Sequence, residues 1–195
     1  MAVSYTDKLN TKATAAGIEK NTKESLAWFK RELAGMKTVN REKLLKDDNF
    51  KARSRPLPGR MFFYTYDPKH KKTLPYYDRF PLIFMVEKAK GGFYGLNLHY
   101  LPHKQRAVFF DRLTDYSTNK KYDSSTRLRL SYNLLKGASK LSMFGPCFKH
   151  YLSSHVRSKM VEVPSDQWEQ VLFMPTESFK KASKTKVWSD SRKSI

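Results

Sequence analysis

The segment 58–102 constrains the fold of this chain more than any other, because it has the residue order expected of consecutive antiparallel strands. Three stretches rich in aromatic and β-branched residues, at 60–66, 82–88 and 92–101, are separated by an excursion rich in Pro and Lys and by a Gly-Gly turn. We therefore predict an α+β fold with a small SH3-like antiparallel β-barrel at its centre, an N-terminal helix and C-terminal helical segments. The predicted barrel core consists of Phe62, Tyr64, Ile83, Phe84, Val86, Phe93, Leu96 and Leu98.

The charge of the chain favours a polyanionic partner. The 38 Lys and Arg residues exceed the 18 Asp and Glu residues and give a formal net charge of +20, a self-repulsion that nucleic acid, an acidic protein or an anionic membrane would relieve. No run of about 18 apolar residues is present to cross a bilayer, and the first residues lack the apolar stretch of a secretory signal. We expect synthesis in the cytoplasm and no membrane partner. A single cysteine, Cys147, excludes an internal disulfide.

The pattern along the chain divides it into three parts. Residues 1–57 are predicted to form an N-terminal arm, over 1–20, and then an amphipathic helix over 22–37 with Leu26, Phe29, Leu33 and Met36 on one face. Residues 58–179 are predicted to form the barrel and its packed helices, and residues 180–195 a basic tail. The tail combines six Lys and Arg residues with one large side chain, Trp188, which we expect to anchor a partner. The alternative is that Trp188 folds back on its own subunit.

The most unbalanced charge lies between residues 104 and 159, where twelve basic residues face three acids. Candidates for contact with nucleic acid or an acidic partner in this segment are Arg106, Arg127, Arg129, Lys136 and Lys140. Six phosphate contacts would give a slope of log K against log salt of about −5. A solvated helix face is the alternative, since charge runs usually have that role.

The excursion 67–81 combines cations with aromatic rings. Lys69, Lys71 and Lys72 are followed by Tyr76 and Tyr77, and single-stranded nucleic acid is often held by such a combination of charge and stacking surface. The alternative is a tightly wrapped loop whose aromatic rings cover the barrel.

No residue pattern indicates catalysis, a metal or a cofactor. His99 and His103 lie four residues apart, but Pro102 between them argues against a shared helical face. Three carboxylates, Asp67, Asp78 and Glu87, have no diagnostic spacing for a magnesium site, and Cys147 lies in apolar surroundings typical of an inert thiol. We therefore predict that the protein is not an enzyme.

Four long phrases carry a resemblance: LPYYDRFPLIFMVEKAKGGFYGLNLHYLP, STRLRLSYNLLKGASK, YLSSHVRSKMVEVPSDQWEQVLFMPTESF and KTKVWSDSRKSI. They resemble a family of tailed-bacteriophage proteins found in T4-like and related contractile-tailed phages, over most of residues 50–195. The resemblance implies a late, non-enzymatic protein of the virion, built into the baseplate, tail or head–tail junction. Its implied partners are other phage structural proteins in a multi-subunit assembly, with DNA as a further candidate. The alternative is a phage DNA-binding protein that protects DNA ends.

Overall fold

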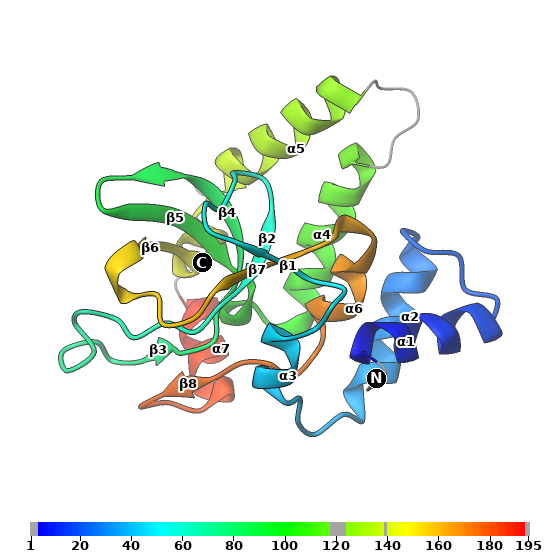
Figure 1. The fold of residues 1–195 in the computed structure, drawn as a ribbon, viewed down its shortest axis with the longest axis horizontal. Helices are drawn as coiled ribbons and strands as arrows, with labels where there is room; N and C mark the ends of the chain where they lie inside the picture. The colour runs from blue at the N-terminus through cyan, green and yellow to red at the C-terminus, as the bar shows by residue number, and fades with distance from the viewer. Residues whose placement is uncertain (1–3, 118–123, 139, 194–195) are drawn as a thin grey trace.

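The computed structural model describes residues 4–117, 124–138 and 140–193, with the backbone alone at 114–117, 124–130 and 142–143. A six-stranded antiparallel sheet lies at its centre, with helices around it (Figure 1). The strand order is β1-β7-β2-β4-β5-β6. The strands are β1 (Lys51–Arg53), β2 (Met61–Phe63), β4 (Leu82–Ala89), β5 (Gly92–Asn97), β6 (Phe148–Leu152) and β7 (Met160–Val163), and β3 (Tyr77–Asp78) pairs with β8 (Phe179–Lys180) in a separate small sheet.

The predicted barrel is wrong, because the sheet of the described residues is open, with β1 and β6 as its two edges. The eight predicted core residues are all buried, but they belong to two hydrophobic clusters. Phe84, Val86, Leu96 and Leu98 lie in a large cluster that includes helical residues. Phe62, Tyr64, Ile83 and Phe93 lie in a smaller aromatic cluster. Because side chains alternate between the faces of a strand, a sheet covered on both sides accounts for this division.

The β4–β5 hairpin confirms the predicted turn. Gly91 has φ +73°, a left-handed conformation that favours glycine. A Cβ atom on Gly92 would lie 1.9 Å from the carbonyl oxygen of Tyr151 on the neighbouring strand β6. The register shifts between Met85 and Glu87, which marks the bulge in the hairpin.

Residues 4–20 do not form the predicted extended arm, because most of them belong to a packed helix. Ser4 caps helix α1 (Tyr5–Ala15) through a hydrogen bond from the Thr6 amide, and α1 buries Thr6, Leu9 and Ala13. These residues follow helical spacing, but two of them are small or polar and give no apolar pattern. The predicted amphipathic helix is confirmed as α2 (Lys23–Ala34), with a capping box between Thr22 and Ser25, and α3 (Arg41–Leu45) follows.

The second half of the chain supplies the helices that pack on the sheet (Figure 1). They are α4 (His103–Ser117), α5 (Ser124–Ala138) and α6 (Trp168–Leu172), with short 3₁₀ helices η1 (Leu98–Tyr100), η2 (Ser142–Cys147), η3 (Ser153–His155) and η4 (Ser165–Gln167) between elements. The Phe84 ring lies 4.9 Å from that of Trp168 and 6.1 Å from that of Phe109. No described helix is long and apolar enough to cross a membrane.

The C-terminal tail is also helical. Helix α7 (Lys184–Lys193) buries Val187 completely, and the Trp188 indole N–H donates to the carbonyl oxygen of His99, 2.8 Å away. The Trp188 ring also lies 5.2 Å from the ring of His103. Trp188 therefore packs on its own chain, as in the alternative considered for it, and the predicted free arm over 180–195 is wrong for the described residues.

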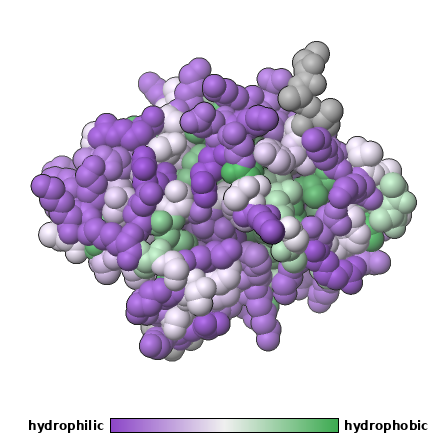
Figure 2. All heavy atoms as spheres, turned by 90° about the horizontal axis from the view of Figure 1, so that it is seen from below, coloured by the Kyte–Doolittle hydropathy of each residue, from purple (hydrophilic) through white to green (hydrophobic). Residues whose placement is uncertain are grey.

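Hydrophilic residues cover most of the face of the molecule seen from below, and hydrophobic residues form small separate areas on it (Figure 2). The exposed large hydrophobic side chains of the described residues, Leu57, Val108 and Leu141, come from distant parts of the sequence. A mainly polar surface suits a chain that carries a net charge of +20.

Candidate nucleic-acid interface

Part of the excursion 67–81 lies at a cleft with a volume of about 460 Å³, which we call the Lys149 cleft. Residues from the excursion, from η1 and from strand β6 line it. They are Tyr66, Pro68, Lys69, His70, Leu74, Tyr76, Tyr77, Asp78, Tyr100, Lys149, His150, Tyr151 and Leu152. Three of the residues predicted from the sequence, Lys69, Tyr76 and Tyr77, therefore line one cleft.

The excursion is held in place at several points. The Asp67 amide donates to the carbonyl oxygen of His155 at 3.1 Å, and the Lys71 ammonium lies 2.9 Å from the Asp67 carboxylate. Lys181 directly follows β8, and its ammonium donates to the carbonyl oxygens of Lys72 and Leu74 at 2.8 and 2.9 Å. This wall of the cleft is therefore fixed by contacts within the chain.

The side chains of the excursion differ in exposure. Lys69, Lys71 and Lys72 are exposed, although of these three only Lys69 lines the cleft, whereas Tyr76 and Tyr77 are half-buried. The Tyr76 ring packs at a tilt 6.1 Å from the Tyr100 ring. The sequence left two interpretations of this segment, a wrapped loop and a binding surface. The two are compatible, because the half-buried tyrosine rings pack partly against the fold and partly line the cleft.

The floor of the cleft is a buried polar network around Asp78. One carboxylate oxygen accepts from the amides of Phe80 and Ser178 at 3.0 and 3.1 Å. The other accepts from Asn97 Nδ2 at 3.2 Å and lies 2.6 Å from His99 Nδ1. Burial opposes ionisation of Asp78, but His99 and these hydrogen bonds hold its pKa below the usual range. Asp78 thus ties β3, β5 and residue 178 together.

The same network has the atom order of a charge relay but no access for a substrate. His99 Nε2 lies 2.9 Å from Thr176 Oγ1, so Asp78, His99 and Thr176 follow one another as in a hydrolytic triad. His99 and Thr176 are 0% exposed and Asp78 4%. Nucleophilic catalysis needs a reachable hydroxyl, and we therefore assign the network a role in holding the cleft floor.

Nothing in the sequence distinguishes Lys149 from the other cations between residues 104 and 159. It lies in β6 opposite Gly95, and its ammonium lies 4.5 Å from the centre of the Tyr100 ring. Burial lowers the pKa of Lys149. Strand alternation in FKHYL predicts that Lys149 and Tyr151 share a face, but only the packing of η1 shows that this face is partly enclosed.

Arg106 was a predicted contact for nucleic acid, and the structure contradicts this. It is 0% exposed and donates to the carbonyl oxygens of Leu101 and Leu172 at 2.8 and 3.0 Å and to the Glu177 carboxylate at 2.5 Å. Although burial alone would raise the pKa of Glu177, the Arg106 guanidinium together with His99 and Lys184 lowers it to about 2. Arg106 thus joins α4 to the segment after α6.

The other four predicted cations of the segment 104–159 lie on α5 or just after it. Arg127 and Arg129 belong to α5, but their side chains lie outside the described ones. Lys136 and Lys140 are exposed, and the Lys136 ammonium lies 3.6 Å from the Glu87 carboxylate. Lys136 and Lys140 thus remain predicted contacts.

The three carboxylates that were considered for a magnesium site have separate partners in the structure. Asp67 pairs with Lys71 and Glu87 with Lys136, while Asp78 belongs to the buried network. Burial raises the pKa of the Cys147 thiol to about 12, which disfavours the reactive thiolate. Within the part of the chain that is described, no group of three or more His, Cys, Asp or Glu residues is placed to hold a metal ion.

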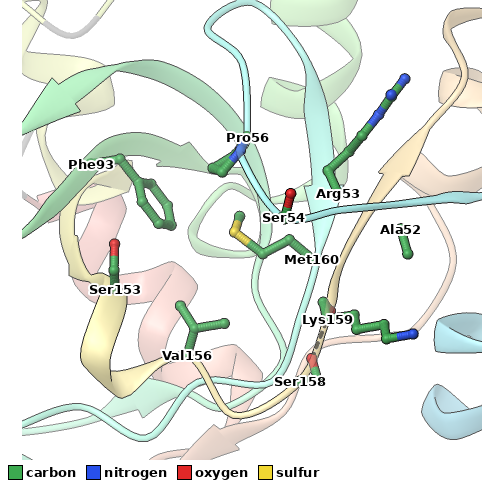
Figure 3. A pocket seen from close by; sticks show the side chains of 10 residues that line it. All are labelled: Ala52, Arg53, Ser54, Pro56, Phe93, Ser153, Val156, Ser158, Lys159 and Met160. Atoms are coloured by element: carbon green, nitrogen blue, oxygen red, sulfur yellow. Dashed lines mark hydrogen bonds between the residues drawn. The ribbon is translucent and has the colours of Figure 1, made fainter.

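A second hollow, of about 560 Å³, lies between β1 and η3 (Figure 3). The side chains of Phe93, Val156 and Met160 surround it, whereas those of Arg53 and Lys159 extend away from it. The Arg53 guanidinium pairs with Glu162 at 2.6 Å. The hollow therefore presents mainly apolar groups and serine hydroxyls, and the Lys149 cleft is the better candidate for a polyanion.

The comparison with protein families gives a match over almost the whole chain. The family model described as phage T4 terminal DNA protecting protein matches residues 1–192. No curated protein and no solved structure matches the chain. The predicted resemblance to T4-like phage proteins is thereby confirmed, and the match favours the alternative of a DNA-end-protecting protein over a structural part of the tail or baseplate.

Proposed function

The chain belongs to the family of the phage T4 terminal DNA protecting protein, and on that premise we propose that it binds the ends of linear duplex DNA and shields them from exonucleases. The match over residues 1–192 carries this proposal, because it includes every element that lines the Lys149 cleft. The protein acts by covering the end and catalyses no reaction.

The distribution of charge supports this function. The β4–β5 hairpin, the excursion 67–81 and η3 lie at the same end of the molecule, opposite α1 and α2 (Figure 1). Exposed cations on or beside these segments are Lys69, Lys71, Lys72, Arg79, Lys88, Lys90, Arg157 and Lys159. Cations that neutralise phosphates supply most of the affinity of a protein for DNA of any sequence. We place the DNA end at this end of the protein.

Protection from a processive exonuclease tests the proposal. A linear duplex is incubated with the protein and then with the nuclease, and we expect full-length DNA to survive at about one protein per end. An excess of short linear duplex, added as a competitor, should abolish protection. A covalently closed circle of equal mass should compete poorly, because it offers phosphates without ends. Equal competition by the circle would reduce the protein to a general DNA binder.

The same mixtures test the absence of catalysis. Incubation of the protein with linear DNA and Mg²⁺ or Mn²⁺, without exonuclease, should leave the DNA length unchanged. Cleavage that disappears in an Asp67→Ala variant would show that the protein is a nuclease.

A further inference from the structure

Lys149 is a partly enclosed cation with no counter-charge beside it in the described part of the chain. Among the described residues no carboxylate lies within 4.0 Å of its ammonium, and its described partner is the face of the Tyr100 ring at 4.5 Å. Withdrawing an ammonium from water is costly, and charges in such positions are normally paired. An anionic ligand in the cleft would supply the missing partner.

The acid that lines the same cleft cannot fill this role. Both oxygens of Asp78 are occupied, one by the two amides and the other by Asn97 and His99. The entrance adds two more basic side chains, Lys69 and His70, both exposed. The cleft is therefore electrostatically complementary to phosphate.

The walls of the cleft are suited to a base. Tyr76 and Tyr77 are half-buried and line the cleft beside Tyr100, and tyrosine rings are common stacking surfaces for nucleobases. The volume of about 460 Å³ is in the range of small-molecule sites. A base inside a duplex has both faces covered by its neighbours, so only an unpaired base can enter such a cleft.

We propose that the Lys149 cleft holds one unpaired nucleotide at the end of the DNA, with a phosphate on Lys149 and the base against the tyrosine walls. This inference rests on the proposed function, and it names the unpaired nucleotide as the feature of the DNA end that the protein recognises. It makes the protein selective for ends with an overhanging nucleotide over blunt ends.

Binding to three matched duplexes tests the inference: a blunt duplex, one with a single 5′ overhanging nucleotide and one with a single 3′ overhanging nucleotide. We expect one overhang to bind about ten-fold more tightly than the blunt end, the effect of one base stacked on an aromatic ring. Lys149→Gln and Tyr77→Leu should each abolish the preference for the overhanging end over the blunt end. The matched control is Lys8→Gln, since Lys8 is exposed on α1, at the opposite end of the molecule (Figure 1). It should keep the preference.

Fluorescence gives a second readout that does not depend on affinity. With 2-aminopurine as the overhanging base, binding of the parent protein should quench its emission, and Tyr77→Leu should restore it even if Lys149→Gln does not fold. Equal affinity for all three ends, with unquenched 2-aminopurine, would overturn the cleft inference while protection from exonuclease stands. If linear ends bind no better than a closed circle, the proposed function fails as well.

Discussion

Arg106 and Lys149 are both withdrawn from solvent, but only Arg106 has a carboxylate partner among the described residues. Its guanidinium makes four hydrogen bonds, three of them to backbone carbonyl groups. Such a planar fork suits a buried structural junction. Lys149, a single point charge on a flexible stem, lines a cleft and remains available to a ligand. The two cations thus have different roles, because Arg106 has a carboxylate partner and Lys149 has an aromatic ring.

Replacement of Arg106 tests its structural role. Arg106→Ala leaves Glu177 without its partner in a buried site, and breaking a buried pair in this way costs about 3–5 kcal/mol. We expect denaturant unfolding to show a loss of that size. Arg112→Ala, an exposed residue on the same helix, should change stability by less than about 0.5 kcal/mol. An Arg106→Ala protein that unfolds like the parent but loses DNA affinity would restore the sequence-based assignment.

The elements show which parts of the fold are encoded locally. The three strand stretches, α2 and the Gly-Gly hairpin were predictable because alternation, helical spacing and turn residues act over a few neighbouring positions. The open strand order of the sheet was not predictable, since it depends on β7 inserting between β1 and β2, a contact between residues about 100 positions apart. For the same reason the candidate site was predicted in part: the excursion supplied Lys69, Tyr76 and Tyr77, but β6 supplied Lys149.

Helix α7 shows the limit of composition as evidence. A polar, basic tail resembles a mobile arm, yet one fully buried side chain, Val187, and the Trp188 hydrogen bond fix it to the core. Deletion of residues 185–195 should cost about 2 kcal/mol or more from the lost burial of Val187 alone, or roughly 4–8 °C in Tm. Replacement of exposed Arg192 and Lys193 by Ala is the control. An unchanged Tm after the deletion would return α7 to the role of an assembly arm.

At the scale of the whole molecule, the ionisable groups around α4 make stability depend on pH. Burial lowers the pKa of His103 from 6.5 to about 4. Burial would raise the pKa of Glu177, but Arg106, His99 and Lys184 together lower it from 4.5 to about 2. Both groups therefore bind fewer protons in the folded chain than in the unfolded chain. Their contribution is complete at neutral pH and is lost as pH falls, between 6.5 and 4 for His103 and between 4.5 and 2 for Glu177.

Denaturant unfolding at several pH values tests this linkage. We expect the free energy of unfolding to decrease from pH 6.5 to pH 4.5 and more steeply below it, although Glu169, whose pKa is raised by burial, opposes the decrease. His103→Gln should flatten the upper part of the profile, because Gln takes up no proton on unfolding, and Glu177→Gln should flatten the lower part. The exposed His70 is the matched control, and His70→Gln should keep the parental profile. A His103→Gln profile with the parental slope between pH 6.5 and 4.5 would show that His103 is protonated in the folded protein, which is incompatible with its enclosure between Phe173 and Trp188.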